Sequence, residues 1–236
     1  MFYYGFDLTY VVLVLPFVIL SLWASANVNS TFKRYSKVHS RRGLTGAQAA
    51  EQVLRNNGVH SVRIERVSGN LTDHFDPKTN VIRLSDDVYG NTSAAAIGVA
   101  CHEAGHAVQY AQNYGPIKLR AAIIPVTNIG SMLAMPLIML GLILNIATEL
   151  SYTFVYIGIA CFGLSLLFQL ITLPVEFNAS HRAVAAISGA GILDKQELDG
   201  AKKTLRAAAL TYVAAAAVSL VQLLRLILIF GGRRDD

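Results

Sequence analysis

Residues 8–26, LTYVVLVLPFVILSLWASA, contain no charged side chain. A helix of about 20 apolar residues is long enough to cross the ~30 Å hydrocarbon layer of a membrane. No basic residue precedes this run, and a cluster of lysines and arginines follows it. That order is typical of an uncleaved membrane anchor. A cleaved signal peptide, the competing interpretation of residues 1–26, begins with a positively charged stretch.

Apolar residues make up 53% of the 236-residue chain and are concentrated in two further blocks. Between residues 121 and 175 the only charged residue is Glu149, and residues 207–224 carry no charge. We therefore predict four transmembrane helices, at about residues 8–26, 121–146, 152–174 and 207–230, the middle two joined as a tight hairpin at NIATELSYT. The fourth contains Gln222 and Arg225, so it either spans the membrane or lies partly on its surface.

Lysines and arginines indicate the orientation of the chain, because cytoplasmic loops are enriched in them. Twelve lie between Lys33 and Arg120 and five between Arg182 and Arg206, whereas none lies in residues 1–32. We expect residues 31–120 and 176–206 to face the cytoplasm, although the two arginines of the tail GGRRDD oppose this orientation. The net charge of +5, without an aromatic-rich RNA- or DNA-binding motif, indicates contact with the lipid bilayer and no nucleic acid partner.

Local start and stop signals predict a small α+β domain in the first cytoplasmic stretch. In LTGAQAAEQVLRNNGV, Thr45 and Gln48 form a capping-box pattern and Asn57-Gly58 a C-terminal stop, which predicts one short helix. VHSVRIERVS and TNVIRLS alternate in polarity and are predicted strands, separated by the turn-rich NLTDHFDPKTN. We also expect TNVIRLS to be an edge strand on which an extended peptide could be aligned.

A helix predicted from about residue 92 to residue 112, capped by Asn91, Thr92 or Ser93, carries HEAGH at residues 102–106. His102 and His106 are four residues apart, so both imidazoles lie on one face and can reach one zinc ion. Glu103 lies beside that face, where a carboxylate can act as general base towards water. Two structural histidines are the alternative, but their desolvation in an apolar helix would be uncompensated.

A catalytic zinc ion needs three protein ligands and one open position. The candidates for the third ligand are His39, His60, His74, His181 and a few carboxylates. Glu176, in LPVEFNAS at the end of the third predicted span, is the strongest, because a carboxylate at such a boundary is unusual. The alternative is a glutamate that only marks the end of the span. His181 points about 140° away from Glu176 on a helix, so the two are not expected to bind one ion.

Arg182 is the candidate for stabilising the oxyanion that forms when a peptide carbonyl is attacked, and we predict a catalytic role for it. The alternative is that Arg182 is simply one of the basic residues beside the membrane. His74 could lie near the site, but a turn or surface position suits it better.

The segments LTDHFDPKTNVIRLS, VACHEAGHAVQ and LPVEFNASHRAV together resemble the YugP-type membrane zinc metallopeptidases of bacteria, and the resemblance covers nearly the whole chain. It implies a mainly α membrane protein of the bacterial inner membrane, with a small cytoplasmic α+β, zincin-like catalytic domain. It also implies a metalloendopeptidase with one zinc ion per chain, bound by His102, His106 and Glu176, with Glu103 as catalytic base.

The arrangement is also similar to that of the HtpX and CAAX-prenyl membrane proteases, in which a helical hairpin separates the two-histidine helix from a glutamate ligand. That glutamate is usually followed four residues later by an aspartate, whereas this chain has Ser180. Asn178, Ser180 or another carboxylate would therefore have to orient a ligand histidine.

These expectations divide the chain into five segments: an N-terminal anchor (1–30), the α+β domain ending in the HEAGH helix (31–120), a transmembrane hairpin (121–175), a cytoplasmic helical segment with the third ligand (176–206), and a C-terminal transmembrane or interfacial helix with its tail (207–236). The expected partners are a protein or peptide substrate and the bilayer. Small residues in the last segment would also permit a homo-oligomer or another membrane protein as partner.

The alternative to a protease is a membrane binding or regulatory protein with a structural or degenerate zinc site. A transporter or channel fits less well, because the spans contain almost no charge.

Overall fold

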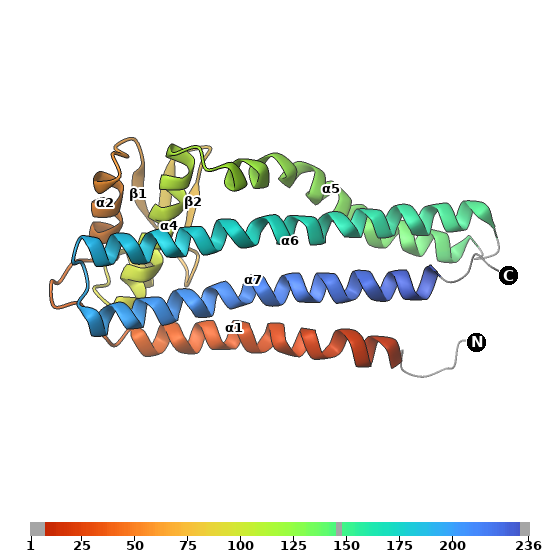
Figure 1. Cartoon of the computed structure of the whole chain (residues 1–236), viewed down its shortest axis with the longest axis horizontal. Helices are drawn as coiled ribbons and strands as arrows, with labels where there is room; N and C mark the ends of the chain where they lie inside the picture. Colours follow the sequence, from red (N-terminus) through yellow and green to blue (C-terminus); the bar gives the residue numbers. More distant parts are fainter. Residues whose placement is uncertain (1–7, 145–147, 232–236) are drawn as a thin grey trace. The chain divides into compact units, whose positions relative to one another are not determined.

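The computed structural model of the chain describes residues 8–144 and 148–231 (Figure 1). Two compact units are present. The membrane unit comprises the described parts of Met1–Trp23, Leu119–Leu173 and Tyr212–Asp236. The site unit comprises Ala24–Lys118 and Pro174–Thr211. The four long helices α1, α5, α6 and α7 each contribute residues to both units, and each unit is described separately below.

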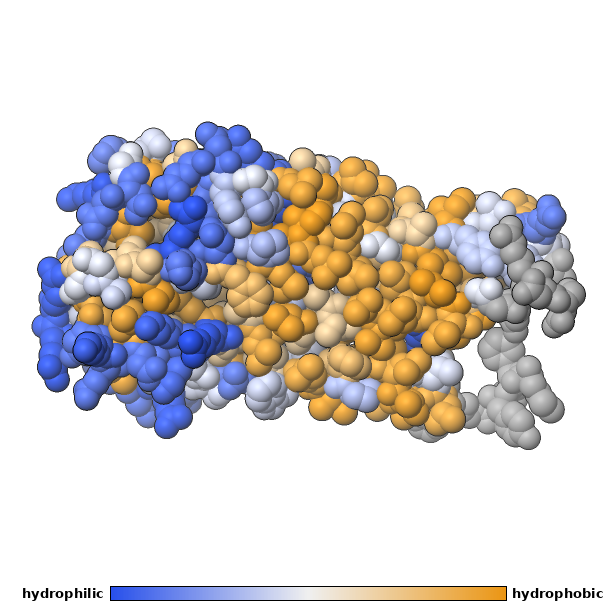
Figure 2. Space-filling view, viewed as in Figure 1, coloured by the Kyte–Doolittle hydropathy of each residue, from blue (hydrophilic) through white to orange (hydrophobic). Residues whose placement is uncertain are grey.

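Four helices are long and apolar enough to cross a membrane, which confirms the prediction of a mainly α membrane protein. They are α1 (Leu15–Tyr35, preceded by a π-helical turn at Tyr10–Val14), α5 (Gly115–Ile143), α6 (Glu149–Gly189) and α7 (Lys195–Phe230). Apolar side chains cover most of the visible surface of the membrane unit (Figure 2). The tip of the predicted hairpin turn, residues 145–147, lies outside the described residues.

Helix α1 continues past the predicted end of the first span at residue 26, and α6 continues past that of the third at residue 174. Helix α7 begins before the predicted start of the fourth span at residue 207. At these positions the side chains change from apolar to polar, but the backbone hydrogen bonds of a helix persist in either environment.

Within the membrane unit, α5 and α6 approach closely at glycines. A Cβ atom on Gly141 would lie 2.7 Å from the carbonyl oxygen of Ser151, and one on Gly158 would lie 2.8 Å from that of Ala134. Small residues commonly allow such contacts between membrane helices.

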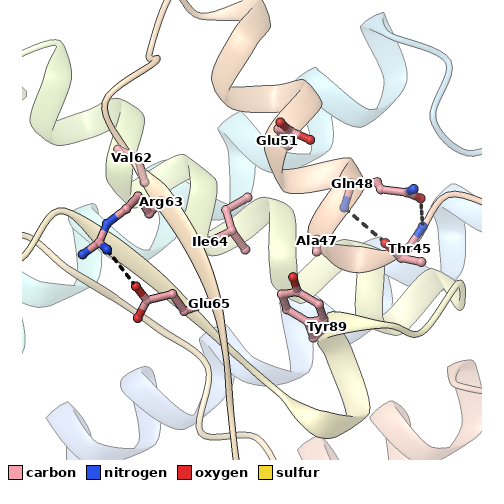
Figure 3. Close-up of a pocket in the computed structure, with 9 residues that line it drawn as sticks. All are labelled: Thr45, Ala47, Gln48, Glu51, Val62, Arg63, Ile64, Glu65 and Tyr89. Carbon is pink, nitrogen blue, oxygen red and sulfur yellow. Dashed lines mark hydrogen bonds and ion pairs between the residues drawn. The ribbon is translucent and has the colours of Figure 1, made fainter.

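In the site unit, helix α2 (Gly46–Asn56) begins and ends where the sequence predicts. The Thr45 side chain accepts a hydrogen bond from the Gln48 amide, and the Gln48 side chain accepts one from the Thr45 amide, so both halves of the capping box are present (Figure 3). Asn57 is the C-cap, and Gly58 follows with a φ of +70°, a conformation that glycine adopts without strain.

The sheet has three strands in the order β1-β3-β2, one more than the sequence predicts. The two predicted strands are confirmed as β1 (Arg63–Val67) and β3 (Val81–Ser85), which pair in parallel. The third, β2 (His74–Asp76), pairs antiparallel with β3 and lies in the segment predicted to be a turn. The Asp76 carboxylate accepts hydrogen bonds from Thr79, the Lys78 amide and Arg83, and these hold its pKa down at about 2.

The prediction that TNVIRLS forms an edge strand is wrong, because β3 lies between β1 and β2 and both of its edges are paired. The edges of the sheet belong to β1 and β2. Along β1 a cavity of about 670 Å³ is bounded by α2 and Tyr89 (Figure 3). Consecutive residues 62–65 all line it, although their side chains alternate between the two faces. The cavity therefore runs along the free edge of β1.

Helix α4 (Ala94–Ala111), which carries HEAGH, is the centre of the core of the site unit. The Ser93 side chain caps it by accepting a hydrogen bond from the Ala96 amide at 3.3 Å, which selects one of the three predicted caps. The short helix α3 (Asp86–Tyr89) precedes it. The largest apolar side chains packed in this core with less than 2% exposure are Ile82, Leu84, Ile97, Ile187 and Ile192.

Candidate metal centre

Helices α4 and α6 approach each other closely at Gly105. A Cβ atom built on Gly105 would lie 2.8 Å from the carbonyl oxygen of Ala179, closer than real Cβ contacts allow. The side chains that flank this contact are His102 and His106 on α4 and Glu176 on α6. The small residue in HEAGH therefore permits the approach that brings these three side chains together.

The nitrogen and oxygen atoms of the three side chains converge. Glu176 Oε2 lies 3.3 Å from His102 Nε2 and 3.5 Å from His106 Nε2. One ligand atom from each residue falls within 4.8 Å of the others. Zinc bonds of about 2.0–2.1 Å in a tetrahedron separate neighbouring ligand atoms by roughly 3.3–3.4 Å. Both the spacing and the donor set, two imidazoles and one carboxylate, therefore fit a catalytic zinc ion.

The three side chains lie in a buried environment. Their exposed fractions are 14% for His102, 11% for His106 and 3% for Glu176. Burial disfavours the protonated form of His106, but the hydrogen bond and charge of Glu176, with the charge of Glu103, outweigh it and raise the pKa of His106. The surroundings thus favour a positive charge between these groups, which a metal ion supplies.

Neutral side chains contact the outer nitrogens of both histidines. Ser180 Oγ lies 3.1 Å from His102 Nδ1, and Gln109 Oε1 lies 3.0 Å from His106 Nδ1. Because the Gln109 amide nitrogen donates to the Val175 carbonyl at 2.9 Å, its oxygen faces His106 and accepts the Nδ1 proton. The Nε2 lone pair of His106 is then directed at the centre. Such contacts set the tautomer and orientation of ligand histidines.

Asn178 acts through Gln109 rather than directly on a histidine. Its side-chain oxygen accepts hydrogen bonds from the Gln109 amide nitrogen at 3.0 Å and from Arg182 Nε at 2.7 Å. Gln109 was not predicted from the sequence and is fully buried. Its position three residues after His106, on the same helix face, was the available signal.

Glu103 is also buried, with 8% of its surface exposed. Its carboxylate interacts electrostatically with that of Asp73, the residue before β2. The Asp73 carboxylate accepts hydrogen bonds from the Ser85 amide at 2.7 Å and the Ser85 hydroxyl at 3.0 Å. Burial, together with the charge of Glu103, raises the pKa of Asp73 despite these hydrogen bonds. Asp73 was not among the predicted site residues. It anchors the β2–β3 hairpin beside the helix that carries Glu103.

The guanidinium of Arg182 is held by three neighbours. Nε donates to Asn178, Nη1 donates to Gln112 Oε1 at 2.6 Å, and the group lies 5.8 Å from the centre of the Tyr114 ring. Arg182 is thus joined to the metal centre through Asn178 and Gln109. Its role in stabilising an oxyanion stays a prediction.

The other candidate histidines lie elsewhere in the described part of the chain and do not join the cluster. His39 Nδ1 is 3.1 Å from Thr92 Oγ1, and His74, exposed on β2, has its Nδ1 2.8 Å from the Thr72 carbonyl. His60 and His181 are exposed.

Comparison with known proteins finds a family model and a relative that each cover most of the chain. Residues 10–231 match the sequence model of a family described as "Putative neutral zinc metallopeptidase". The chain is 48% identical over 217 residues to "Putative membrane protease YugP" of Bacillus subtilis (strain 168), and the alignment covers 92% of this chain and 94% of that protein. No solved structure matches the chain.

Proposed function

The chain belongs to the family described as "Putative neutral zinc metallopeptidase", and we propose that it is a zinc-dependent endopeptidase that hydrolyses peptide bonds at the centre formed by His102, His106 and Glu176. The match to YugP confirms the resemblance seen in the sequence. The observation that supports the activity most strongly is the convergence of three ligand atoms, with both histidine-to-glutamate distances at tetrahedral spacing and Glu103 next to His102 in the sequence.

Zinc, when bound, would supply a Lewis acid that acidifies water and polarises a peptide carbonyl. Glu103 has the place in the sequence of a general base: it accepts the proton of the attacking water and delivers it to the leaving amine. Burial of Glu103 keeps bulk water from competing for that proton. Ser180 and Gln109 hold the two imidazoles in the required orientation.

Arg182 is the residue we propose for the oxyanion. A guanidinium has five N–H donors, and those directed at Asn178 and Gln112 leave others for a substrate oxygen. The network around Arg182 would limit its motion, so that a donor is already in place when negative charge develops.

We further propose that the protein is a multi-pass protein of the bacterial inner membrane with its metal centre on the cytoplasmic side. The support is the distribution of lysine and arginine, which are absent from residues 1–32 and frequent in residues 33–120 and 182–206. Membrane-impermeant labelling of single cysteines placed at Lys37 and Lys195 tests this, since both should react only after the membrane is opened.

Purified protein in detergent, with metal content and cleavage of labelled casein as readouts, tests the activity. We expect about one zinc ion per chain, full zinc content but no cleavage in Glu103→Gln, and loss of zinc in Glu176→Ala. Glu51→Gln, an exposed glutamate on α2, is the matched control and should retain both zinc and cleavage. Cleavage that survives Glu103→Gln would refute the mechanism. A structural zinc site, the alternative, would call for a fourth ligand, and the cluster found among residues 8–144 and 148–231 has three members.

A further inference from the structure

Helices α1 and α7 lie side by side (Figure 1). In the site unit a cavity of about 320 Å³ lies between them, lined by residues that play no part in the metal centre. On α1 the lining residues are Asn27, Thr31, Arg34 and Tyr35. The first three follow one another at intervals of four and three residues, so they form a single stripe on the helix. The stripe is polar at one end and carries a guanidinium at the other.

Helix α7 presents a matching stripe. Lys203, Arg206, Ala207 and Leu210 line the cavity at intervals of three, one and three residues. The two helices are in close contact one turn before Lys203, because a Cβ atom on Gly200 would lie 2.8 Å from the Tyr35 ring. The cavity therefore has a closely packed end at Tyr35 and Gly200 and an apolar end at Ala207 and Leu210.

The lining is positively charged. It contains Arg34, Lys203 and Arg206 but no carboxylate. Lys203 Nζ pairs with Asp199 at 2.6 Å, whereas no described carboxylate lies within ion-pair distance of Arg34 or Arg206. Arg34 and Lys203 each lie about 6 Å from the centre of the Tyr35 ring, and both line the same cavity as Arg206. An anion placed there would meet two guanidinium groups that have no anionic partner.

The cavity lies where both helices change from apolar to polar. Asn27 is the first residue after the predicted span 8–26, and Ala207 begins the uncharged run 207–224. On each helix, the cavity residues therefore adjoin the segment long enough to cross the hydrocarbon layer. That is the level of lipid headgroups. In the proposed orientation it is the cytoplasmic side, where anionic lipids attract basic residues.

We propose that this cavity binds the phosphate of an anionic phospholipid headgroup. Arg34 and Arg206 supply the planar, forked donors that suit phosphate oxygens. Asn27 and Thr31 offer hydrogen bonds to the glycerol part, and Ala207 and Leu210 contact the start of the acyl chains. A free phosphate ion could bind the same arginines, but it would make no contact with the apolar end of the cavity. This site goes beyond proteolysis and does not depend on it.

Trp23 permits a direct test, because it is the single tryptophan of the chain and lies on α1 one turn before Asn27. It is 54% exposed, so lipid can reach it. The full chain is reconstituted into phosphatidylcholine vesicles that contain equal fractions of brominated phosphatidylglycerol or brominated phosphatidylcholine. The ratio of the two quenching curves of Trp23 gives the preference for the anionic lipid. We expect a clear preference in the unmodified protein.

The informative variant is Arg34→Gln/Arg206→Gln, and the matched control is Lys33→Gln/Lys202→Gln. The control removes the same charge from neighbouring residues of the same helices that do not line the cavity. A guanidinium that hydrogen-bonds the phosphate directly contributes more than a charge that acts only through the surface potential. We therefore expect the preference to fall roughly fivefold or more for each arginine removed, and clearly less in the control.

Equal loss in both double variants, or no loss in either, would overturn the proposal, because the preference would then come from general surface charge or from elsewhere. Loss of the preference on addition of inorganic phosphate, but not of sodium chloride at the same ionic strength, would assign the cavity to free phosphate instead. Single Arg34→Gln and Arg206→Gln variants, each with an intermediate preference, guard against a double variant that fails to fold. Unchanged zinc content and unchanged Trp23 emission in pure phosphatidylcholine verify folding.

Discussion

Substituting Gly105 by alanine probes the contact that assembles the metal centre. The added Cβ would lie 2.8 Å from the Ala179 carbonyl oxygen, about 0.6 Å inside the 3.4 Å at which ordinary contacts begin. Both sides of this contact are helix backbone, so no side chain can rotate away, and α4 and α6 must separate locally by a similar amount. A zinc site tolerates changes of only about 0.2 Å in its ligand distances.

Separating the two helices moves the ligands apart, because His102 and His106 are on α4 and Glu176 is on α6. We therefore expect Gly105→Ala to lower the affinity for zinc at least as much as loss of a partner of a ligand histidine does, roughly 10–100-fold. By helix propensity alone, replacing glycine by alanine would raise the free energy of unfolding by about 1 kcal/mol. Overpacking of a close contact costs about 1–3 kcal/mol, so the net change should be neutral to destabilising.

Competition between the purified protein and a colorimetric zinc chelator measures the affinity, and thermal unfolding of the zinc-free protein in detergent measures the stability. Gly189→Ala is the control, because it lies on α6 and a Cβ built there meets no atom within 4 Å. It should bind zinc normally. If Gly105→Ala also binds zinc with unchanged affinity, the close approach of α4 and α6 does not determine the ligand geometry, and the reasoning is refuted.

Three further predictions follow from the contacts of single residues. Gln109→Leu removes the acceptor of the His106 Nδ1 proton in a fully buried place, so zinc affinity in the same chelator titration should fall roughly 10–100-fold. Ser180→Ala removes the contact to His102, but water can replace the hydroxyl at this partly buried position, so a smaller fall, roughly tenfold at most, is expected. Asp76 has a pKa lowered from 3.8 to about 2 in the folded chain, so its stabilising effect is complete above pH 3.8 and is lost as the pH falls towards 2. The difference between the unfolding midpoints of the unmodified protein and Asp76→Asn should therefore shrink across that range, and a constant difference would contradict the assignment.

Several elements could be predicted because their signals are local. The Thr45 capping box, the Ser93 cap and the stop at Gly58 depend on hydrogen bonds and dihedral angles within a few residues, and all three occur. The strands β1 and β3 carry a partial polarity pattern, since Ile64 lies between charged neighbours in β1 and Arg83 lies between Ile82 and Leu84 in β3. Strand β2 has only three residues and includes no such pattern. It exists because β3 offers it a partner, a contact that its own residues do not encode.

The order of the strands could not be predicted for the same reason. β1 and β3 pair in parallel with β2 added on the far side of β3, so the strand expected at the edge is central. Strand order depends on which backbone edges meet after the chain has folded. Local polarity patterns report only which face of a strand is buried.

By itself the sequence determined that this is a membrane protein and that His102 and His106 share a helix face. A run of about 20 uncharged residues must satisfy its backbone within a helix in lipid, and a spacing of four residues sets the angle between two side chains. Only the tertiary structure decided that Glu176, and not one of the exposed histidines, joins them, and that Ser180 and Gln109 contact their rings. The physical reason is that Glu176 and Ser180 lie some 70 positions from the histidines, and Gln109 is oriented by Val175 at a similar separation. These contacts form through the approach of two helices, which depends on close packing at Gly105 and Ala179.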